Sequence, residues 1–454
     1  MAKWITRRIE RIALQRMRET PVLLLQGPRT VGKSTLLRSL AERHRARVVD
    51  LDDPAVRGAA AGDPALFVSG LGPVFIDEYQ HVPELLDAIK SELNRDGSAG
   101  RFVIAGSTRF AALPLVSQSL TGRLHRIELH PFSQGEIDAR HESLVETLFG
   151  DPASLASPTV STTTRDDYVQ RVVRGGLPLA LSDSAAARDR WFDDYIALCL
   201  ERDLLEPGRV RQPGVLAPLL RRVATQSAQV LNMSRAGDAV GLAATTAADY
   251  IRLFEASFLV RLLPAWGRTS RAASTARPKA HMVDSGVAAR LLRLPPARLG
   301  SLEPAALQQF GHLFETFVVG EVLKQTSWLE HQPTASHWRS RDGAEVDLVL
   351  ENGHDGTVVG VEVKAGTRLR PADRRGLDAL RRLVGDRFTA GVIFHTGPHC
   401  SRLDDSGRLI GLPVDRLWTP GAFGPNDPGH RPLSDGTPSV RQLPCDCALG
   451  PDHR

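Results

Sequence analysis

The first part of the chain alternates short apolar runs with amphipathic segments, a pattern that predicts strands alternating with helices. Apolar-rich runs occur at 21–25, 47–51, 73–76 and 102–105, and each is bounded by polar or glycine-rich residues. Runs of this length suit strands buried on both faces of a parallel sheet. We therefore predict an α/β domain with a parallel sheet, preceded by an amphipathic helix over residues 3–19.

A glycine-rich segment directly follows the first predicted strand. It matches the phosphate-loop pattern G-x-x-x-x-G-K-[ST] at every position, and its glycines would let backbone N–H groups approach a triphosphate. Lys33 is expected to reach the β- and γ-phosphates, and the Ser34 hydroxyl to hold Mg²⁺. ATP and Mg²⁺ are therefore the expected cofactors. The predicted nucleotide-binding residues of the loop are Gly27, Pro28, Arg29, Thr30, Val31, Gly32, Lys33, Ser34 and Thr35.

Polar residues follow two later predicted strands, where ligands of a parallel sheet bind. Asp77 and Glu78 come directly after the run 73–76. We expect Asp77 to orient Mg²⁺ and Glu78 to polarise the attacking water. Ser107, which follows the run 102–105, is expected to contact the γ-phosphate.

Arg123 precedes another predicted strand, at 126–129. It is a candidate arginine finger, which would offset charge on the γ-phosphate of its own nucleotide or of a neighbour's. A structural salt bridge is the alternative role for Arg123.

The middle of the chain changes pattern. A Ser- and Thr-rich stretch at 142–167 predicts a surface loop, and helical periodicity resumes at Tyr168. Between 214 and 264 the pattern predicts three short helices, the third capped by Thr245, and then a strand. This order is typical of a winged helix-turn-helix. The third helix offers only Arg252 as a base reader, so DNA contact and a purely structural role both remain open.

A second group of candidate residues lies near the C-terminus. Strands predicted at 345–350 and 358–363 form a hairpin that carries Asp347 and Glu362, and Lys364 leaves the same face as Glu362. Glu315 lies in an apolar helical segment. This spacing is that of a metal-dependent nuclease, in which the three carboxylates hold Mg²⁺ and Lys364 positions or activates the attacking water. The alternative is an exposed Lys364–Glu362 ion pair.

Several motifs together resemble a known family. G-P-R-T-V-G-K-S-T, V-F-I-D-E-Y-Q, I-A-G-S-T-R-F, S-L-T-G-R and L-H-P-F-S-Q-G-E resemble the prokaryotic AAA+-type P-loop ATPases that carry a C-terminal domain of unknown function with a PD-(D/E)XK nuclease-like core. The likeness continues through V-V-R-G-G-L-P at 172–178 and V-D-S-G at 283–286.

The resemblance implies an α/β fold in several parts. These are a P-loop ATPase core at 1–140, a helical lid and connector at 141–212, a winged-helix-like domain at 213–265 and a restriction-endonuclease-like α/β domain at 266–418. Residues 419–454 are dense in Pro, Gly and Asp with little apolar periodicity, which predicts a disordered tail.

Composition narrows the class of protein without deciding its partners. Among 454 residues the formal charge is 57 minus 52, or +5, which permits contact with a polyanion without demanding it. Four cysteines, no secretory signal and no run of eighteen apolar residues predict a cytoplasmic protein with no membrane partner.

Together these features predict an ATPase that couples ATP hydrolysis to a C-terminal domain acting on or binding DNA or RNA. The alternative is a nucleotide-switched scaffold that binds a protein or nucleic-acid partner without cleaving it. Homo-oligomerisation stays open.

Overall fold

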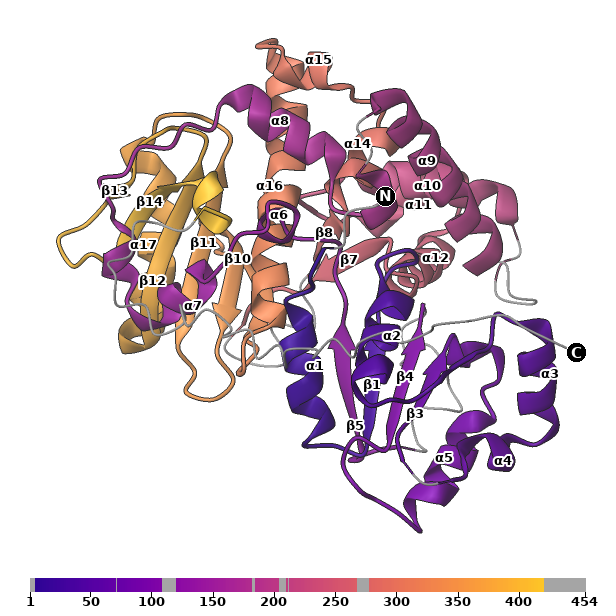
Figure 1. The fold of residues 1–454 in the computed structure, drawn as a ribbon. Helices are drawn as coiled ribbons and strands as arrows, with labels where there is room; N and C mark the ends of the chain where they lie inside the picture. The colour runs from indigo at the N-terminus through magenta and orange to yellow at the C-terminus, as the bar shows by residue number, and fades with distance from the viewer. Residues whose placement is uncertain are drawn as a thin grey trace, which may run out of the picture. The chain divides into compact units, whose positions relative to one another are not determined.

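The computed structural model describes residues 5–70, 72–107, 120–181, 184–203, 210, 212–267 and 277–419 (Figure 1). The predicted tail lies outside these residues from position 420 onward. No helix in the described ranges is both long and apolar enough to cross a membrane.

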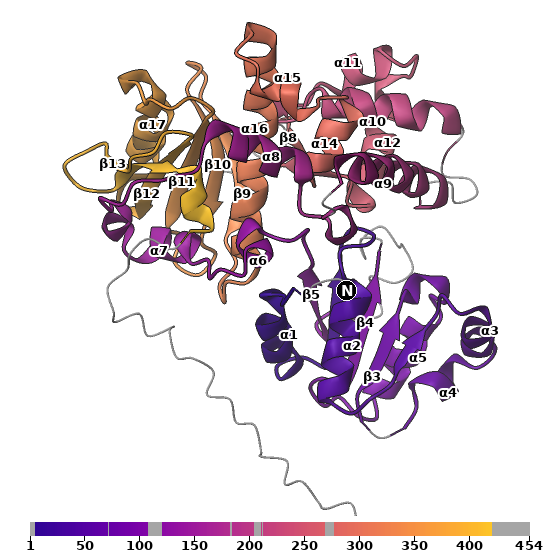
Figure 2. The ribbon, with the colours of Figure 1, turned by 45° about the horizontal axis from the view of Figure 1, so that its top comes forward.

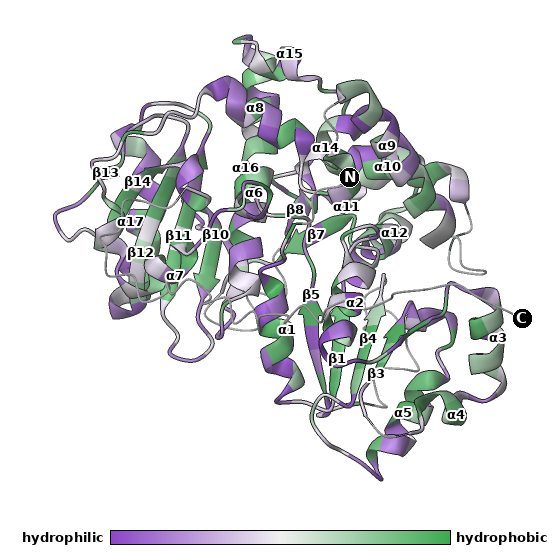
Figure 3. Cartoon of the chain, viewed as in Figure 1, coloured by the Kyte–Doolittle hydropathy of each residue, from purple (hydrophilic) through white to green (hydrophobic). Residues whose placement is uncertain are grey.

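The N-terminal sheet has five parallel strands in the order β2-β3-β4-β1-β5, which confirms the predicted α/β domain. Strands β1, β3 and β4 are largely apolar (Figure 3). The strands are β1 (Val22–Gln26), β2 (Val48–Asp50), β3 (Val74–Asp77), β4 (Phe102–Gly106) and β5 (Leu124–Glu128).

Helices cover both faces of this sheet because neighbouring side chains of each buried strand point to opposite sides. Leu23 and Leu25 pack with α1 (Ile9–Met17) and α2 (Lys33–Arg43). Val22 and Leu24 belong to the core on the other face, and the arrangement can be followed in Figure 2. That face is covered by α3 (Pro54–Gly62), α4 (Pro64–Val68) and α5 (Leu85–Leu93).

The stretch predicted as a loop at 142–167 is in part helical, so that prediction was wrong there. Helix α7 (Leu144–Gly150) buries Leu144, Val145 and Leu148. The helix is short, so its apolar periodicity is hard to recognise beside the Ser- and Thr-rich residues that follow. Those residues are irregular from 157 to 164. Around it lie α6 (Gln134–Ile137), α8 (Arg165–Arg174) and α9 (Ala185–Leu198).

The middle region has the order helix, strand, two helices and two strands. Its strands pair antiparallel in the order β6-β8-β7. Thr245 does not cap the third helix, because that helix begins at Ala244 after Ala243 and has no side-chain cap. The elements are α10 (Leu216–Ala224), β6 (Gln229–Val230), α11 (Met233–Asp238), α12 (Ala244–Ala256), β7 (Val260–Leu263) and β8 (Lys279–Met282).

The C-terminal region contains a six-stranded mixed sheet in the order β13-β14-β12-β11-β10-β9. The predicted hairpin is confirmed, since β10 pairs antiparallel with β11. Apolar residues on one face pack with α16, and those on the other face pack with α17. The elements are α14 (Ser285–Leu291), α15 (Pro296–Gly300), α16 (Pro304–Ser327), β9 (Thr334–Arg339), β10 (Glu345–Glu351), β11 (Val358–Lys364), α17 (Arg375–Val384), β12 (Phe388–His395), β13 (Ser401–Arg402) and β14 (Leu409–Pro413).

Candidate nucleotide site and a buried carboxylate cluster

The phosphate loop connects the end of β1 to the start of α2, and its two glycines are required for different reasons. A Cβ atom on Gly27 would lie 2.4 Å from the carbonyl oxygen of Leu129, so a larger residue would collide with backbone. Gly32 has open space around it but a φ of +97°, a conformation that L-residues rarely adopt. Pro28 and Val31 are buried, whereas Arg29, Thr30 and Thr35 are at least partly exposed.

Lys33 lies inside this loop. Its side chain is only 4% exposed, and Nζ donates hydrogen bonds to the carbonyl oxygens of Gly27 (3.1 Å) and Pro28 (2.8 Å). The ammonium therefore already lies in the concave side of the loop, where a phosphate group would gain from its charge.

A hydroxyl and a carboxylate lie together beside the loop. The Ser34 side chain lies close to the carboxylate of Asp77, which is 2% exposed at the end of β3. Burial raises the pKa of Asp77, and the nearby Ser34 hydroxyl opposes that rise. Hydroxyl and carboxylate oxygens are the ligands that Mg²⁺ prefers, so the residues present fit a nucleotide-bound magnesium ion.

Glu78 lies next to Asp77 and is held by two neighbours. The Ser107 hydroxyl donates to its Oε2 at 3.2 Å, and the Gln80 amide donates to the same oxygen. Ser107 therefore lies at the predicted sheet edge, but it contacts Glu78. Gln80 stands only two positions after Glu78, but nothing in the sequence around it indicates that its amide donates to this carboxylate.

The structure does not bring Arg123 to its own phosphate loop. Leu124 pairs with Val22 at the start of β1, and the loop follows Gln26 at the other end of that strand. A five-residue strand at about 3.3 Å per residue separates the two ends by roughly 16 Å. Arg123 donates to the side chain of Asn94 at 2.9 Å. Action on a neighbour's nucleotide stays a prediction.

The S-Q-G-E segment after β5 begins with a capping box, formed by Ser133 and Glu136. Glu142 accepts hydrogen bonds from the Ser133 hydroxyl (2.6 Å) and from the N–H of Gly135 (2.9 Å). Burial raises the pKa of Glu142 to about 8, and the nearby Glu321 carboxylate acts in the same direction. The segment is thus held by buried carboxylates.

The same segment is tied to α16 by a buried ion pair. The N–H of Gln134 donates to Glu321 at 2.8 Å, and Lys324 Nζ lies 2.6 Å from the other oxygen of Glu321. Lys324 also donates to the carbonyl oxygen of Phe132 at 3.0 Å. Glu321 is fully buried and Lys324 is 7% exposed. These contacts join the end of the N-terminal domain to the long helix of the C-terminal region.

The motifs at 172–178 and 283–286 meet in space. Asp284 accepts a hydrogen bond from the N–H of Gly176 at 2.8 Å, and a Cβ atom on Gly175 would lie 2.2 Å from its Oδ1. The Ser285 hydroxyl donates to the carbonyl oxygen of Val172 at 2.7 Å. The two motifs therefore form one buried structural contact.

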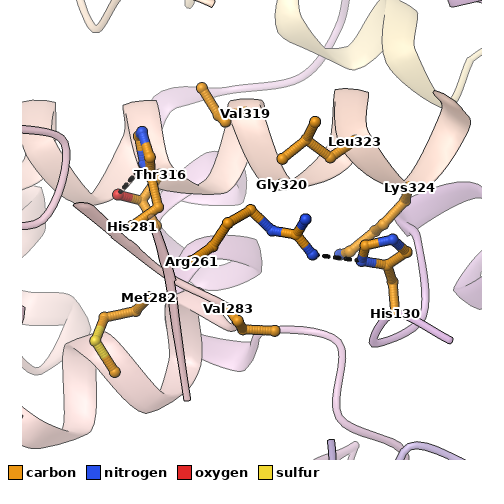
Figure 4. A pocket seen from close by; sticks show the side chains of 10 residues that line it. All are labelled: His130, Arg261, His281, Met282, Val283, Thr316, Val319, Gly320, Leu323 and Lys324. Carbon is orange, nitrogen blue, oxygen red and sulfur yellow. Dashed lines mark hydrogen bonds between the residues drawn. The ribbon is translucent and has the colours of Figure 1, made fainter. Parts of the chain in front are cut away.

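Two small cavities border the N-terminal domain. One is lined by Pro28 of the phosphate loop together with Leu177, Phe258 and Val283, so the loop abuts the middle region. The other lies beside Arg261, as Figure 4 shows.

Arg261 links the end of β5 to the middle sheet. Its guanidinium contacts the Glu128 carboxylate. It also lies 3.4 Å from Nδ1 of His130 (Figure 4). His281, across the cavity, hydrogen-bonds Thr316 of α16 at 3.2 Å. Burial lowers the pKa of both His130 and His281 to about 3, so both imidazoles are neutral at physiological pH.

The structure also brings together the candidate residues of the C-terminal region, with a further lysine among them. Lys279 of β8 contacts the Glu315 carboxylate of α16, and its Nζ lies 2.8 Å from Oδ1 of Asp347 on β10. Oδ2 of Asp347 accepts a hydrogen bond from the N–H of Val363 at 2.9 Å. Sequence reasoning missed Lys279 because it lies outside the motif and on a different sheet.

Glu362 and Lys364 form the other half of this cluster. Their side chains leave one face of β11 as predicted and pair at 2.5 Å. Lys364 is partly exposed, but Glu362 is 7% exposed, so the pair is not the exposed edge pair considered as the alternative.

Burial governs the ionisation of the three acids in the cluster. It raises the pKa of Glu315 well above its ordinary value and that of Glu362 to about 8. Burial acts in the same direction on Asp347, but the ammonium of Lys279 outweighs it and lowers the pKa of that carboxyl. Together these side chains do not fit a metal ion. Across the described ranges, no group of three or more His, Cys, Asp or Glu side chains has the arrangement of a metal site.

Three protein-family models match successive parts of the chain. An AAA domain model matches residues 19–138, and two domains of unknown function, DUF8612 and DUF4143, match residues 165–298 and 310–414. The AAA match spans all five strands of the first sheet and the phosphate loop. It therefore supports ATP binding and ATPase activity for this domain, and the N-terminal region is a P-loop domain of the AAA type.

Similar proteins add little about the other two regions. Uncharacterized proteins of Mycobacterium tuberculosis and Mycobacterium bovis are each 29% identical to the chain over 416 residues, which cover 89% of this chain and 83% of each relative. Among solved structures, the Walker-type ATPase of Pyrococcus abyssi matches with a TM-score of 0.38 and 15% identity, over 62% of this chain and 94% of that one. AMPPCP-bound DnaA from Aquifex aeolicus matches with a TM-score of 0.26 and 12% identity, over 56% and 89% of the two chains. TM-scores this low carry no argument about function.

Proposed function

We propose that the chain is a Mg²⁺-dependent ATPase that couples its nucleotide cycle to a C-terminal domain with a nuclease-like fold, and that this domain binds its partner without cleaving it. The observation that carries the ATPase assignment is the position of Lys33, whose Nζ donates to the carbonyl oxygens of Gly27 and Pro28 inside a phosphate loop that has Ser34 and the buried Asp77 beside it.

Each residue at the loop would have one task. Lys33 would contact the β- and γ-phosphates, and Ser34 and Asp77 would hold Mg²⁺, which offsets charge on the transferring phosphoryl group. Glu78 would orient the attacking water. Both of its bonds to Ser107 and Gln80 are made by Oε2, which leaves Oε1 to accept a proton from that water.

The contacts around the loop support coupling to the rest of the chain. Pro28 borders a cavity shared with Leu177 and Phe258, so a change of loop conformation on nucleotide binding would reach the middle region directly. The Arg261–Glu128 ion pair makes a second connection between the two regions. A rigid connection through both contacts would transmit the nucleotide state.

The order of elements in the middle region supports a winged-helix-like domain. Its third helix, α12, exposes Thr245, Asp249 and Arg252, and Arg252 is paired with Asp249 at 2.7 Å. A single cation that is already paired is a poor surface for a polyanion. We therefore assign this domain a coupling role instead of base recognition.

The order of elements in the C-terminal region supports a nuclease-like core. Helix α16 is followed by three antiparallel strands, by α17 and by β12, which pairs parallel to β11. The fold serves here as a binding platform, because Lys279 fills the position between Glu315 and Asp347. Fold alone does not establish cleavage.

The proposal is tested by measuring ATP hydrolysis by the purified chain alone, with DNA and with RNA, and by examining each nucleic acid afterwards. Hydrolysis that DNA or RNA accelerates, with the nucleic acid left intact, supports a nucleic-acid platform. Hydrolysis that neither accelerates favours a protein partner. No hydrolysis under any condition contradicts the ATPase assignment, and cleavage that disappears in Asp347→Ala contradicts the non-cleaving role.

A further inference from the structure

The buried carboxylates of the C-terminal region share a cation supplied by a different sheet. Glu315 lies on α16 and Asp347 on β10, whereas Lys279 lies on β8 of the middle sheet. Lys279 is 6% exposed, and its ammonium contacts both carboxylates. The contact therefore connects two sheets that are far apart in sequence.

We propose that Lys279 is a built-in counter-ion that takes the place of a divalent metal between Glu315 and Asp347, so that this cluster binds neither Mg²⁺ nor Mn²⁺. A metal ion at the same oxygens would lie next to a buried ammonium, and the like charges would repel strongly where little water screens them. For a metal to bind, the lysine would first have to leave its two partners.

The remaining oxygens of the cluster strengthen this inference. Asp347 Oδ2 accepts from the N–H of Val363 at 2.9 Å, and Glu362 Oε1 pairs with Lys364 at 2.5 Å. Among the described residues, only Glu362 Oε2 is buried here with neither a hydrogen bond nor an ion-pair partner. An ion held at this oxygen would have to keep most of its octahedral ligand shell as water.

The charges also balance without a metal. Two lysines face three carboxylates, so the cluster carries at most one excess negative charge, and a divalent ion would replace it with an excess positive charge in a buried position. Buried charges are tolerated when they are paired, which favours the lysine over the metal.

A titration of the nucleotide-free chain with Mn²⁺ tests the proposal, with free Mn²⁺ followed by electron paramagnetic resonance. An Asp77→Asn background removes the carboxylate proposed to hold Mg²⁺ beside the phosphate loop, so the result does not depend on the ATPase assignment. We expect no bound Mn²⁺ in this background. Adding Lys279→Met should create one Mn²⁺ site, and a further Asp347→Asn should remove it. The double variant Lys324→Met with Glu321→Gln, which also removes a buried lysine but leaves no unpaired partner carboxylate, should create no site.

If Lys279→Met folds poorly, thermal unfolding provides a second measurement of Mn²⁺ binding. The unpaired carboxylates should lower its Tm, and Mn²⁺ should raise that Tm while leaving the parent Tm unchanged. Lys279→Gln, which keeps a hydrogen-bond donor, should also have a lower Tm than the parent, and Mn²⁺ should raise that Tm. Mn²⁺ bound by the Asp77→Asn chain and lost with Asp347→Asn would overturn the proposal, as would neutral variants at position 279 that neither bind Mn²⁺ nor gain Tm from it.

Discussion

Replacing Lys324 by Met should strongly destabilise the junction between the N-terminal domain and α16. Lys324 is 7% exposed, pairs with the fully buried Glu321 at 2.6 Å and donates to the Phe132 carbonyl at 3.0 Å. Removing one partner of a buried pair leaves an uncompensated charge and costs about 3–5 kcal/mol. The carbonyl left without a donor adds about 1–3 kcal/mol, so the loss should lie at or above the upper part of the first range.

The matched control is the double variant Glu321→Gln with Lys324→Met. Gln removes the buried charge but keeps an amide oxygen that can accept from the N–H of Gln134. Replacing both charges should therefore recover most of the stability that the single variant loses. Guanidinium unfolding followed by circular dichroism measures the midpoint of the first transition in each protein. A single variant within about 1 kcal/mol of the parent, the worth of an exposed pair, would refute the reasoning. So would a double variant no more stable than the single one.

Three further predictions follow from other contacts. Glu142→Gln should lessen the loss of stability between pH 5 and pH 8. Because the pKa of Glu142 is raised to about 8 from 4.5, its contribution to stability is fully present below pH 4.5 and is lost as the pH rises toward 8. The loss is about 1.4 kcal/mol per pKa unit. Equal pH dependence of parent and variant in thermal unfolding would contradict this. Gly27→Ala should weaken ATP binding more than Gly32→Ala, because only the first new Cβ meets backbone, at 2.4 Å; calorimetry showing the reverse order would contradict the account of the loop. Mixing Arg123→Ala with Lys33→Ala protein should restore some ATP turnover if Arg123 acts on a neighbour's nucleotide, and a chain that stays monomeric with ATP and shows no recovery would assign Arg123 a structural role.

The phosphate loop and the strand ends could be predicted because local patterns determine them. Gly27, Gly32 and Lys33 belong to one short motif, and the carboxylates of Asp77 and Glu78 follow an apolar run directly. Strand parity predicted that Glu362 and Lys364 leave one face of β11, and the structure has them on one face, paired with each other. Such features depend on neighbours in sequence, so periodicity and motif spacing are sufficient to predict them.

Features that depend on tertiary contact could not be predicted in this way. Arg123 precedes a strand as expected, but strand direction and register, which pair Leu124 with Val22, place it at the sheet edge away from the loop. Lys279 meets Asp347 only because β8 lies beside the C-terminal region. Ser107, just after β4, meets Glu78, just after β3, because these two strands pair over a long sequence separation, and Gln80 in the turn after β3 converges on the same oxygen.

The central claim is that residues 19–138 bind and hydrolyse ATP through Lys33 and Glu78. The most direct measurement compares ATP affinity and turnover in the parent, Lys33→Ala and Glu78→Gln. Lys33→Ala removes charge-assisted hydrogen bonds worth about 1.5–3 kcal/mol, so ATP affinity should fall by roughly 10- to 100-fold and turnover should cease. Glu78→Gln should bind ATP like the parent but hydrolyse it at least about 100-fold more slowly, the lower bound for losing a positioned general base. Hydrolysis by Glu78→Gln at the parent rate would contradict the account, because another group would then orient the attacking water.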